Sequence, residues 1–193
     1  MNFDNYDFLD TSKFAGKIIL TSFPGLIENT RFDISFFLKE IKIFKDNNCS
    51  SITSFVEDSE FEKICDKKNL VEQIYHNKLK WYHLPIKDLG APNTEFKFKW
   101  ETTKVLLKNE LIEGKNIVLH CRGGKGRAGT VAALLLIDFG VKKEEEIKCH
   151  KYIFDGEIFY VNVENDNAYD KNMEFVGSKL GNGINFNADE KEN

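Results

Sequence analysis

Residues 116–127 have the sequence NIVLHCRGGKGR, and this stretch decides how the chain folds. The apolar run from Asn116 to Leu119 predicts a buried strand, and the apolar run from Ala128 to Phe139 predicts a buried helix. Cys121 then follows directly on a strand, a glycine-rich loop comes after it, and Arg127 opens the next helix. A loop placed in this way lies outside the carboxyl end of a strand, where α/β folds bind their ligands.

The composition of this loop favours a phosphate ligand. Its backbone N–H groups can converge on one anion because glycine tolerates the unusual dihedral angles required, and the helix N-terminus adds positive potential. The same field favours the thiolate form of Cys121, which is a nucleophile aimed at phosphorus, while the planar fork of Arg127 grips two phosphate oxygens. The predicted phosphate-binding residues are Arg122, Gly123, Gly124, Lys125, Gly126 and Arg127.

The pattern H-C-x5-R over residues 120–127 resembles the signature loop of the cysteine-dependent protein phosphatases, the tyrosine and dual-specificity superfamily. Within it, the chain is most similar to the group that contains the cyclin-dependent-kinase-associated phosphatase. The resemblance covers roughly Lys17 to Tyr169. It implies that Cys121 attacks phosphorus to form a cysteinyl-phosphate, that an aspartate protonates the leaving oxygen, and that water then releases phosphate. Asp88, in the segment LPIKDLGAP 33 residues before Cys121, resembles the general acid of this family.

Other readings of the loop explain less of it. Residues 124–129 (GKGRAG) formally match the G-x-G-x-x-G dinucleotide fingerprint, but Cys149 and His150 stand where that fingerprint needs an acidic residue. A nucleoside-triphosphate-binding loop is excluded, because this loop has no Gly-Lys-Ser/Thr at the required spacing. A structural interpretation without chemistry is also available, in which Cys121 is a small buried residue and Asp88 is an ordinary turn aspartate. That interpretation does not account for Arg127 and the glycines together.

Two departures from the family pattern concern the second chemical step. Family members usually carry Ser or Thr directly after the loop arginine, and that hydroxyl helps the thiolate leave; this chain has Ala128. Thr130 points elsewhere on a helix. Relatives often place a late glutamine to position the water, whereas the only glutamine is Gln73. Candidates for that role are Asn165, Asp166 and Asn167.

Composition bounds the class of protein. The 193 residues suffice for one domain, and 41% hydrophobic with 30% charged residues predicts a soluble globular chain. The net charge of −4 argues against nucleic-acid binding, and no apolar run spans a bilayer. The four cysteines (49, 65, 121 and 149) show no metal-type pairing, so we expect no metal, no cofactor and a reducing, cytoplasmic setting. We also expect a monomer.

The pattern of elements predicts an α/β fold, a mostly parallel central sheet flanked by helices. Expected strands are 17–22, 50–56, 79–84 and 116–119. Expected helices begin near Asp33, run over parts of 60–76, extend from Asn93 or Thr94 to about Glu113, and cover 128–139, 142–152 and 167–180. We expect a lead-in at 1–15, a phosphatase domain at 16–180 and a disordered tail at 181–193.

Three functions remain open at this point. The first is a phosphatase acting on phosphotyrosine, and on phosphoserine or phosphothreonine, in proteins. The second keeps the chemistry but acts on a phosphoinositide or inositol phosphate, since Lys125 and Arg122 add charge to the loop. The third is a slow phosphatase-like module that binds phosphoproteins, which Ala128 and the missing glutamine favour.

Overall fold

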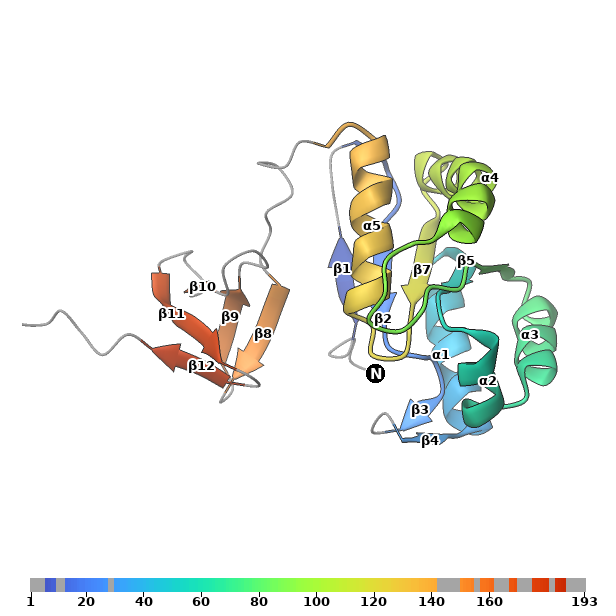
Figure 1. The fold of residues 1–193 in the computed structure, drawn as a ribbon, viewed down its shortest axis with the longest axis horizontal. Helices are drawn as coiled ribbons and strands as arrows, with labels where there is room; N and C mark the ends of the chain where they lie inside the picture. The colour runs from blue at the N-terminus through green and yellow to red at the C-terminus, as the bar shows by residue number, and fades with distance from the viewer. Residues whose placement is uncertain are drawn as a thin grey trace, which may run out of the picture. The chain divides into compact units, whose positions relative to one another are not determined.

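The computed structural model describes residues 6–9, 13–27 and 30–141 in full, and the strands 150–154, 157–161, 167–169, 175–180 and 183–186 as backbone. The chain divides into two compact units, residues 1–140 and residues 141–193 (Figure 1). Each unit is described separately below. The division falls at Gly140, whereas the sequence predicted one domain over 16–180.

The first unit is built on a five-stranded sheet with the order β1-β2-β7-β5-β6. Four strands run parallel, and β1 is antiparallel to β2 at one edge, which agrees with the predicted mostly parallel sheet. The strands are β1 (Asp7–Leu9), β2 (Ile18–Thr21), β5 (Cys49–Ser54), β6 (Lys80–His83) and β7 (Asn116–His120). The four strands expected from the sequence correspond to β2, β5, β6 and β7.

Helices cover the sheet and begin where the sequence places capping residues. Asp33 accepts a hydrogen bond from the Phe36 N–H at 2.9 Å, and Asn93 accepts one from Phe96 at 2.8 Å, so both are N-caps as predicted. The helices are α1 (Ile34–Asp46), α2 (Asp58–Ile64), α3 (Lys67–His76), α4 (Thr94–Ile112) and α5 (Gly126–Asp138) (Figure 1). A short pair, β3 (Leu26–Ile27) and β4 (Arg31–Phe32), precedes α1.

The core lies on both faces of the central strands. Ile18 and Ile19 of β2 are both fully buried, although successive side chains of a strand point to opposite faces. One face packs with Phe37, Ile41 and Phe44 of α1, and the other lies under α4 and α5. Burial on both faces explains why β2 and β7 read as continuous apolar runs rather than as alternating patterns.

The register of the parallel strands brings three chain segments to one level. His120 of β7 lies beside Thr21 of β2 and beside Ser54 of β5. The residues that follow each of these positions leave the sheet at the same edge. Cys121 therefore emerges between the segments that follow β2 and β5, as expected for a site at the carboxyl ends of parallel strands.

The second unit differs from the sequence prediction. It forms an antiparallel sheet of β8 (His150–Phe154), β9 (Glu157–Val161), β10 (Asn167–Tyr169), β11 (Phe175–Leu180) and β12 (Gly183–Phe186), in the order β12-β11-β10-β9-β8. The predicted helix over 167–180 is wrong, because β10 and β11 occupy it. The helix predicted over 142–152 is wrong at 150–152, and residues 142–149 lie outside the described residues. A strand, β12, lies inside the tail predicted to be disordered.

The second unit had a readable signal. Phe154 pairs with Glu157 across β8 and β9, and the two residues between them in sequence are Asp155-Gly156. Asp-Gly between aromatic and β-branched runs is a strong signal for a hairpin. The segments KYIF and EIFYV carry that composition, which favours strands over helices.

Candidate active site

The loop after β7 wraps around the Cys121 sulfur. Cys121 is buried, with 3% of its surface exposed, and its Sγ accepts a hydrogen bond from the Gly124 N–H at 3.2 Å. Gly124 has φ +78°, and a Cβ there would lie 2.6 Å from the backbone of both Thr21 and Ser22. Only glycine fits this position, because a side chain would collide with the chain leaving β2. The loop predicted from the sequence is therefore formed against a neighbouring strand.

Two backbone hydrogen bonds fix the loop to its neighbours in the sheet. The Phe23 N–H donates to the Arg122 carbonyl at 3.1 Å, and the Phe55 N–H donates to the His120 carbonyl at 3.0 Å. These bonds continue the β2–β7 and β5–β7 pairings past the ends of the strands. The segment that carries Cys121 is held from both sides, so its geometry is preorganised.

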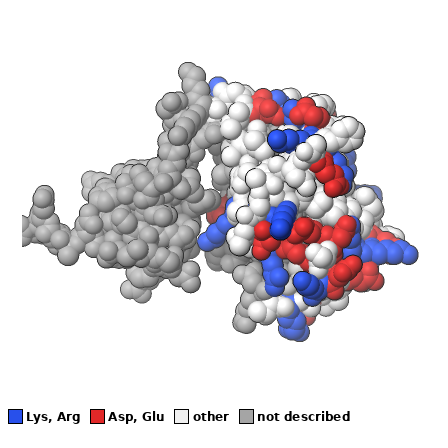
Figure 2. Space-filling view, in the orientation of Figure 1, with Lys and Arg blue, Asp and Glu red and all other residues white. Residues whose placement is uncertain are grey.

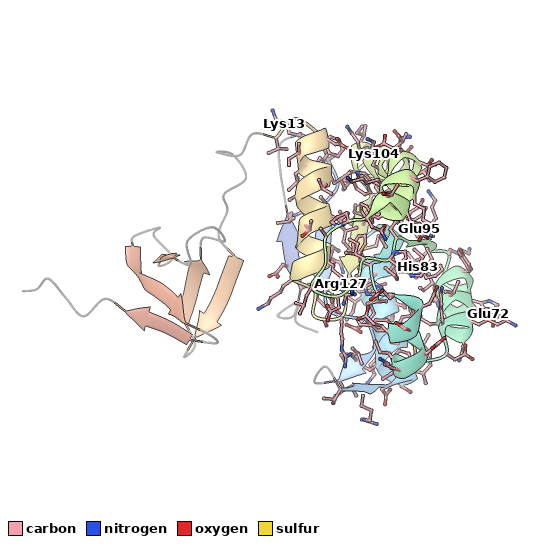
Figure 3. The ribbon with its side chains drawn as sticks, in the orientation of Figure 1. Lys13, Glu72, His83, Glu95, Lys104 and Arg127 are labelled. Carbon is pink, nitrogen blue, oxygen red and sulfur yellow. The ribbon has the colours of Figure 1, made fainter. Side chains whose placement is uncertain are left out.

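Arg127 is buried and is oriented by a carboxylate that the sequence analysis did not identify. Its Nη1 donates to Glu60 Oε2 at 2.5 Å and its Nη2 to Glu60 Oε1 at 2.9 Å, a bidentate pair. Nη1 also donates to the Ile86 carbonyl at 3.1 Å. Burial alone would raise the pKa of Glu60, but Arg127 outweighs burial and holds that pKa below its ordinary value. The guanidinium, labelled in Figure 3, thus has a fixed position at the start of α5.

The start of α2 contacts both Arg127 and the loop that carries Asp88. Glu60 accepts the Glu57 N–H at 2.9 Å and completes a capping box with Glu57, so one carboxylate closes the helix and holds Arg127. The Glu57 carboxylate also accepts the Asp88 N–H at 3.4 Å. The signal for these residues was the E-x-x-E spacing at the start of a helix, which predicts a cap but not a contact 67 residues away.

Asp88 reaches the same guanidinium from another loop. Its Oδ1 lies 3.2 Å from Arg127 Nη2, and its side chain is 64% exposed. The following residue, Leu89, is fully exposed and has φ +56°, in a turn closed by a hydrogen bond from the Gly90 N–H to the Lys87 carbonyl at 2.9 Å. A leucine rarely adopts a positive φ, and such strain is typical of functional loops.

Behind the loop, His120 is held in one tautomer. Its Nδ1 lies 3.3 Å from the Cys121 carbonyl, which only accepts, so Nδ1 carries the proton. Its Nε2 lies 2.6 Å from Ser54 Oγ, which in turn accepts the Trp81 indole N–H at 2.8 Å. Complete burial lowers the pKa of His120 to about 4, so the ring is neutral near pH 7. His120 is therefore a positioning residue, and Ser54 and Trp81 extend its hydrogen-bond network.

The remaining residues of the loop after β7 face solvent. Arg122 and Lys125 are exposed, and ideal Cβ atoms at Gly123 and Gly126 would meet nothing within 4 Å. Acidic side chains gather near the middle of the described part in the view of Figure 2, over the region where Figure 3 places Arg127. Among the described residues no cluster of His, Cys, Asp or Glu could hold a metal ion.

The residues that bear on hydrolysis also have definite places. Ala128 is fully buried at the first turn of α5. The Thr130 hydroxyl is exposed and donates to the Gly126 carbonyl at 3.0 Å, so it does not stand in for the hydroxyl that Ala128 lacks. Gln73 lies on α3. Asn165 and Asp166 lie outside the described residues, and Asn167 begins β10.

The other described cysteines lack the environment of Cys121. Burial raises the pKa of Cys49 to about 12, and burial followed by the charge of Asp66 raises that of Cys65 to about 12. Neither receives a backbone N–H from a glycine loop. All three described cysteines are free thiols. The geometry therefore singles out Cys121 as the candidate nucleophile.

Comparison with known proteins agrees with this geometry. Residues 62–157 match the family model described as PTP-SAK, Swiss Army Knife protein, DSP-PTPase phosphatase domain, and this range contains Asp88, Cys121 and Arg127. Two viral relatives match over 72 residues each: "Putative tyrosine phosphatase 067L" of Invertebrate iridescent virus 3 at 43% identity and "Putative tyrosine phosphatase 197R" of Invertebrate iridescent virus 6 at 33%. The matches cover 36% and 37% of this chain but only 29% and 27% of those proteins.

Solved structures share the fold. Kinase-associated phosphatase, in a form whose catalytic-site cysteine is replaced by serine, has a TM-score of 0.59 at 22% identity, covering 72% of this chain and 76% of that one. The phosphatase Tk-PTP in its active form has a TM-score of 0.51 at 22% identity, covering 75% and 80%. No helix among the described residues is long and apolar enough to span a membrane. With the signature loop between β7 and α5, residues 62–157 form a phosphatase domain of the cysteine-dependent tyrosine and dual-specificity superfamily.

Proposed function

We propose that this chain hydrolyses phosphomonoesters, with phosphotyrosine in proteins as the principal substrate and phosphoserine or phosphothreonine as further ones. The observation that carries the proposal is the convergence of three groups. The Cys121 sulfur lies in the glycine loop, Arg127 is oriented by Glu60, and the Asp88 carboxylate is 3.2 Å from the same guanidinium. A nucleophile, an anion-binding fork and an acid thus meet at one edge of the sheet.

The chemistry follows from these positions. The Cys121 thiolate attacks phosphorus, the bond from phosphorus to the ester oxygen breaks, and Asp88 gives its proton to that oxygen. Water then attacks the cysteinyl-phosphate, Asp88 takes a proton from the water, and the thiolate leaves as inorganic phosphate is released. Arg127 and the loop N–H groups, including that of Gly124, stabilise the charge on the phosphoryl oxygens.

A protein substrate is favoured over a polyanionic one by the surroundings of the site. Glu57 and Asp58 begin α2, Asp88 lies on Arg127 in the loop between β6 and α4, and acidic side chains gather on this face (Figure 2). Such carboxylates repel an inositol polyphosphate more strongly than a single phosphorylated side chain. The free thiols support a reducing, cytoplasmic compartment, and we propose that the protein acts as a monomer.

Replacement of the nucleophile tests this function. Cys121→Ser should abolish release of phosphate from a phosphotyrosine peptide while retaining binding of the peptide, measured by calorimetry. Cys65→Ser is the matched control, because Cys65 is the C-cap of α2, at the other end of the helix from Glu60, and the activity of this variant should stay within about twofold of wild type. Measurable turnover by Cys121→Ser, or equal losses in both variants, would count against covalent catalysis at Cys121.

A further inference from the structure

A groove of about 360 Å³ lies between β6 and α4, beside the loop that carries Asp88. Residues 81–84 form one wall, and Phe98, Lys99 and two threonines of α4 form the other. β6 is an edge strand of its sheet, so nothing in the sheet lies beyond it. His83 and Glu95, labelled in Figure 3, come from the β6 side and the α4 side of this region.

Four polar side chains of the groove walls already have partners. Tyr82 OH donates to Glu110 at 3.0 Å, and Trp81 Nε1 donates to Ser54 at 2.8 Å. The His83 ring lies 2.9 Å from the Val56 carbonyl through Nε2, and Lys99 Nζ donates to Glu95 at 2.9 Å. The walls therefore offer a ligand carbon surface beside polar groups that are already engaged, together with the partly exposed Lys99 side chain.

Phe98 makes this carbon surface unusual. Its side chain is 83% exposed, although Phe96 and Trp100 on either side of it in sequence are buried. An aromatic ring left in water at the rim of a groove loses apolar burial worth about 2 kcal/mol, which a ligand can recover. The fully exposed Leu89, held at a positive φ beside Asp88, presents a second apolar side chain on the loop between β6 and α4.

The groove adjoins the loop that carries Asp88. Residues 84–93 form the loop that connects β6 to α4, and this loop carries Asp88. Leu84 at the end of the groove is two residues before Ile86, whose carbonyl accepts the Arg127 hydrogen bond at 3.1 Å. Two residues of this chain span about 7 Å at roughly 3.3 Å per extended residue, so a substrate peptide bound at Cys121 needs about three extended residues to reach the groove.

We propose that this groove binds an apolar side chain of the phosphoprotein substrate, about three residues from the phosphorylated one, with Phe98 as the specificity-determining contact. This inference rests on the proposed phosphatase function. The position of the groove beside the Asp88 loop favours a substrate segment as its occupant. The satisfied polar walls favour an apolar side chain over a charged one.

A phosphotyrosine peptide series tests the groove. Peptides of one sequence carry Leu, Ala or Asp at each position up to four residues on either side of the phosphotyrosine. For the wild-type protein, kcat/KM should be about tenfold higher for Leu than for Ala at one position near the third residue, and lower for Asp. In Phe98→Ala this Leu-to-Ala ratio should fall to within about twofold of one. Ile112→Ala is the matched control, because Ile112 is also exposed on α4 but does not line the groove, and it should keep the ratio.

The outcomes separate the groove from the chemistry. Cys121-dependent hydrolysis of a small aryl phosphate together with a flat peptide profile would overturn the groove and leave the phosphatase function standing. A Leu preference that survives Phe98→Ala would also overturn it. A larger fall in Tm for Phe98→Ala than for Ile112→Ala, with the peptide preference unchanged, would mean that another part of the chain covers Phe98. Absence of Cys121-dependent hydrolysis on every substrate would instead remove the phosphatase function.

Discussion

Two buried carboxylates at opposite ends of the parallel sheet have different partners. At the carboxyl ends of the strands, Glu60 binds the guanidinium of Arg127 through two hydrogen bonds. Near the amino ends, Glu110 of α4 accepts hydrogen bonds from Lys80, Tyr82 and two serines of β5, at 2.5 to 3.0 Å. Both carboxylates are less than 10% exposed. Burial alone would raise the pKa of each, yet their partners hold both below the ordinary value.

The difference shows when a buried carboxylate serves a binding site and when it only holds secondary-structure elements together. The donors around Glu110 come from two strands, β5 and β6, and their hydrogen bonds join α4 to the edge of the sheet. Glu60 instead orients a cation whose other neighbours are the exposed Asp88 and the loop that holds Cys121. A carboxylate matched by hydroxyls and an amine closes a structure, whereas one matched by a guanidinium aims charge at a ligand.

The largest loss of activity should come from replacing Asp88, the exposed carboxylate beside Arg127. Among the described residues, the cluster around Glu110 contains no comparable exposed acid. Asp88→Asn keeps the shape but removes the proton donor, so kcat should fall about 10²–10⁴-fold for alkyl or peptide phosphates with poor leaving groups. Steady-state kinetics on aryl phosphates of graded leaving-group acidity measures this. Substrates whose leaving group needs no proton should lose much less. An equal loss across the series would assign Asp88 to structure alone.

The comparison itself is tested by the same substitution at both ends. Glu60→Gln leaves Arg127 without its fixed partner, so kcat/KM should fall about 10–100-fold, a loss expected when a positioned group shifts by about 1 Å. Glu110→Gln should lower the free energy of unfolding by about 1–3 kcal/mol, with kcat/KM within about twofold of wild type. Urea unfolding and steady-state kinetics on both proteins give the two numbers. Similar activity losses in the two variants would erase the distinction.

Acidification sharpens the test at Glu110. Because the folded pKa of Glu110 lies below its ordinary value, the ionised carboxylate stabilises the fold above the unfolded pKa of about 4.3, and this contribution is lost as the pH falls through the folded pKa. The stability difference between wild type and Glu110→Gln should therefore be full at pH 6 and shrink below about pH 4.

The smallest effect concerns the step after Cys121 attack. Ala128 is buried and carries no hydroxyl, and Thr130 is engaged with Gly126. The phosphoenzyme should accumulate, so rapid mixing should give a burst of leaving group followed by a slow steady rate. Ala128→Ser should raise the steady rate a few-fold and change the burst little. No burst in the wild type, with no gain in Ala128→Ser, would mean that hydrolysis is already fast.

Local patterns predicted the parallel strands and most of the helices of the first unit, whereas β1, β3 and β4 were not expected. The apolar run before Cys121, the glycines after it and the caps Asp33 and Asn93 act within a few residues, so sequence spacing reports them directly. The loop position of Asp88 was predicted by family resemblance. The structure places its carboxylate on Arg127.

What the sequence did not disclose depends on distant contacts. Glu60 meets Arg127 across 67 residues and Ser54 meets His120 across 66, and neither pairing leaves a mark on local composition. The second unit was misread for another reason. The prediction of helices over 142–152 and 167–180 conflicts with Asp155-Gly156 and the aromatic and β-branched runs beside it, which favour a hairpin.

The capping box of α2 couples local opening of that helix to the position of Arg127. Glu60 accepts the Glu57 N–H that closes the first turn of α2, and the same oxygen accepts from Arg127. Fraying of that turn therefore releases the guanidinium, and a ligand that tightens Arg127 tightens the turn. The amide of Glu57 should report ligand binding as slower hydrogen exchange, although it belongs to neither the signature loop nor the acid loop.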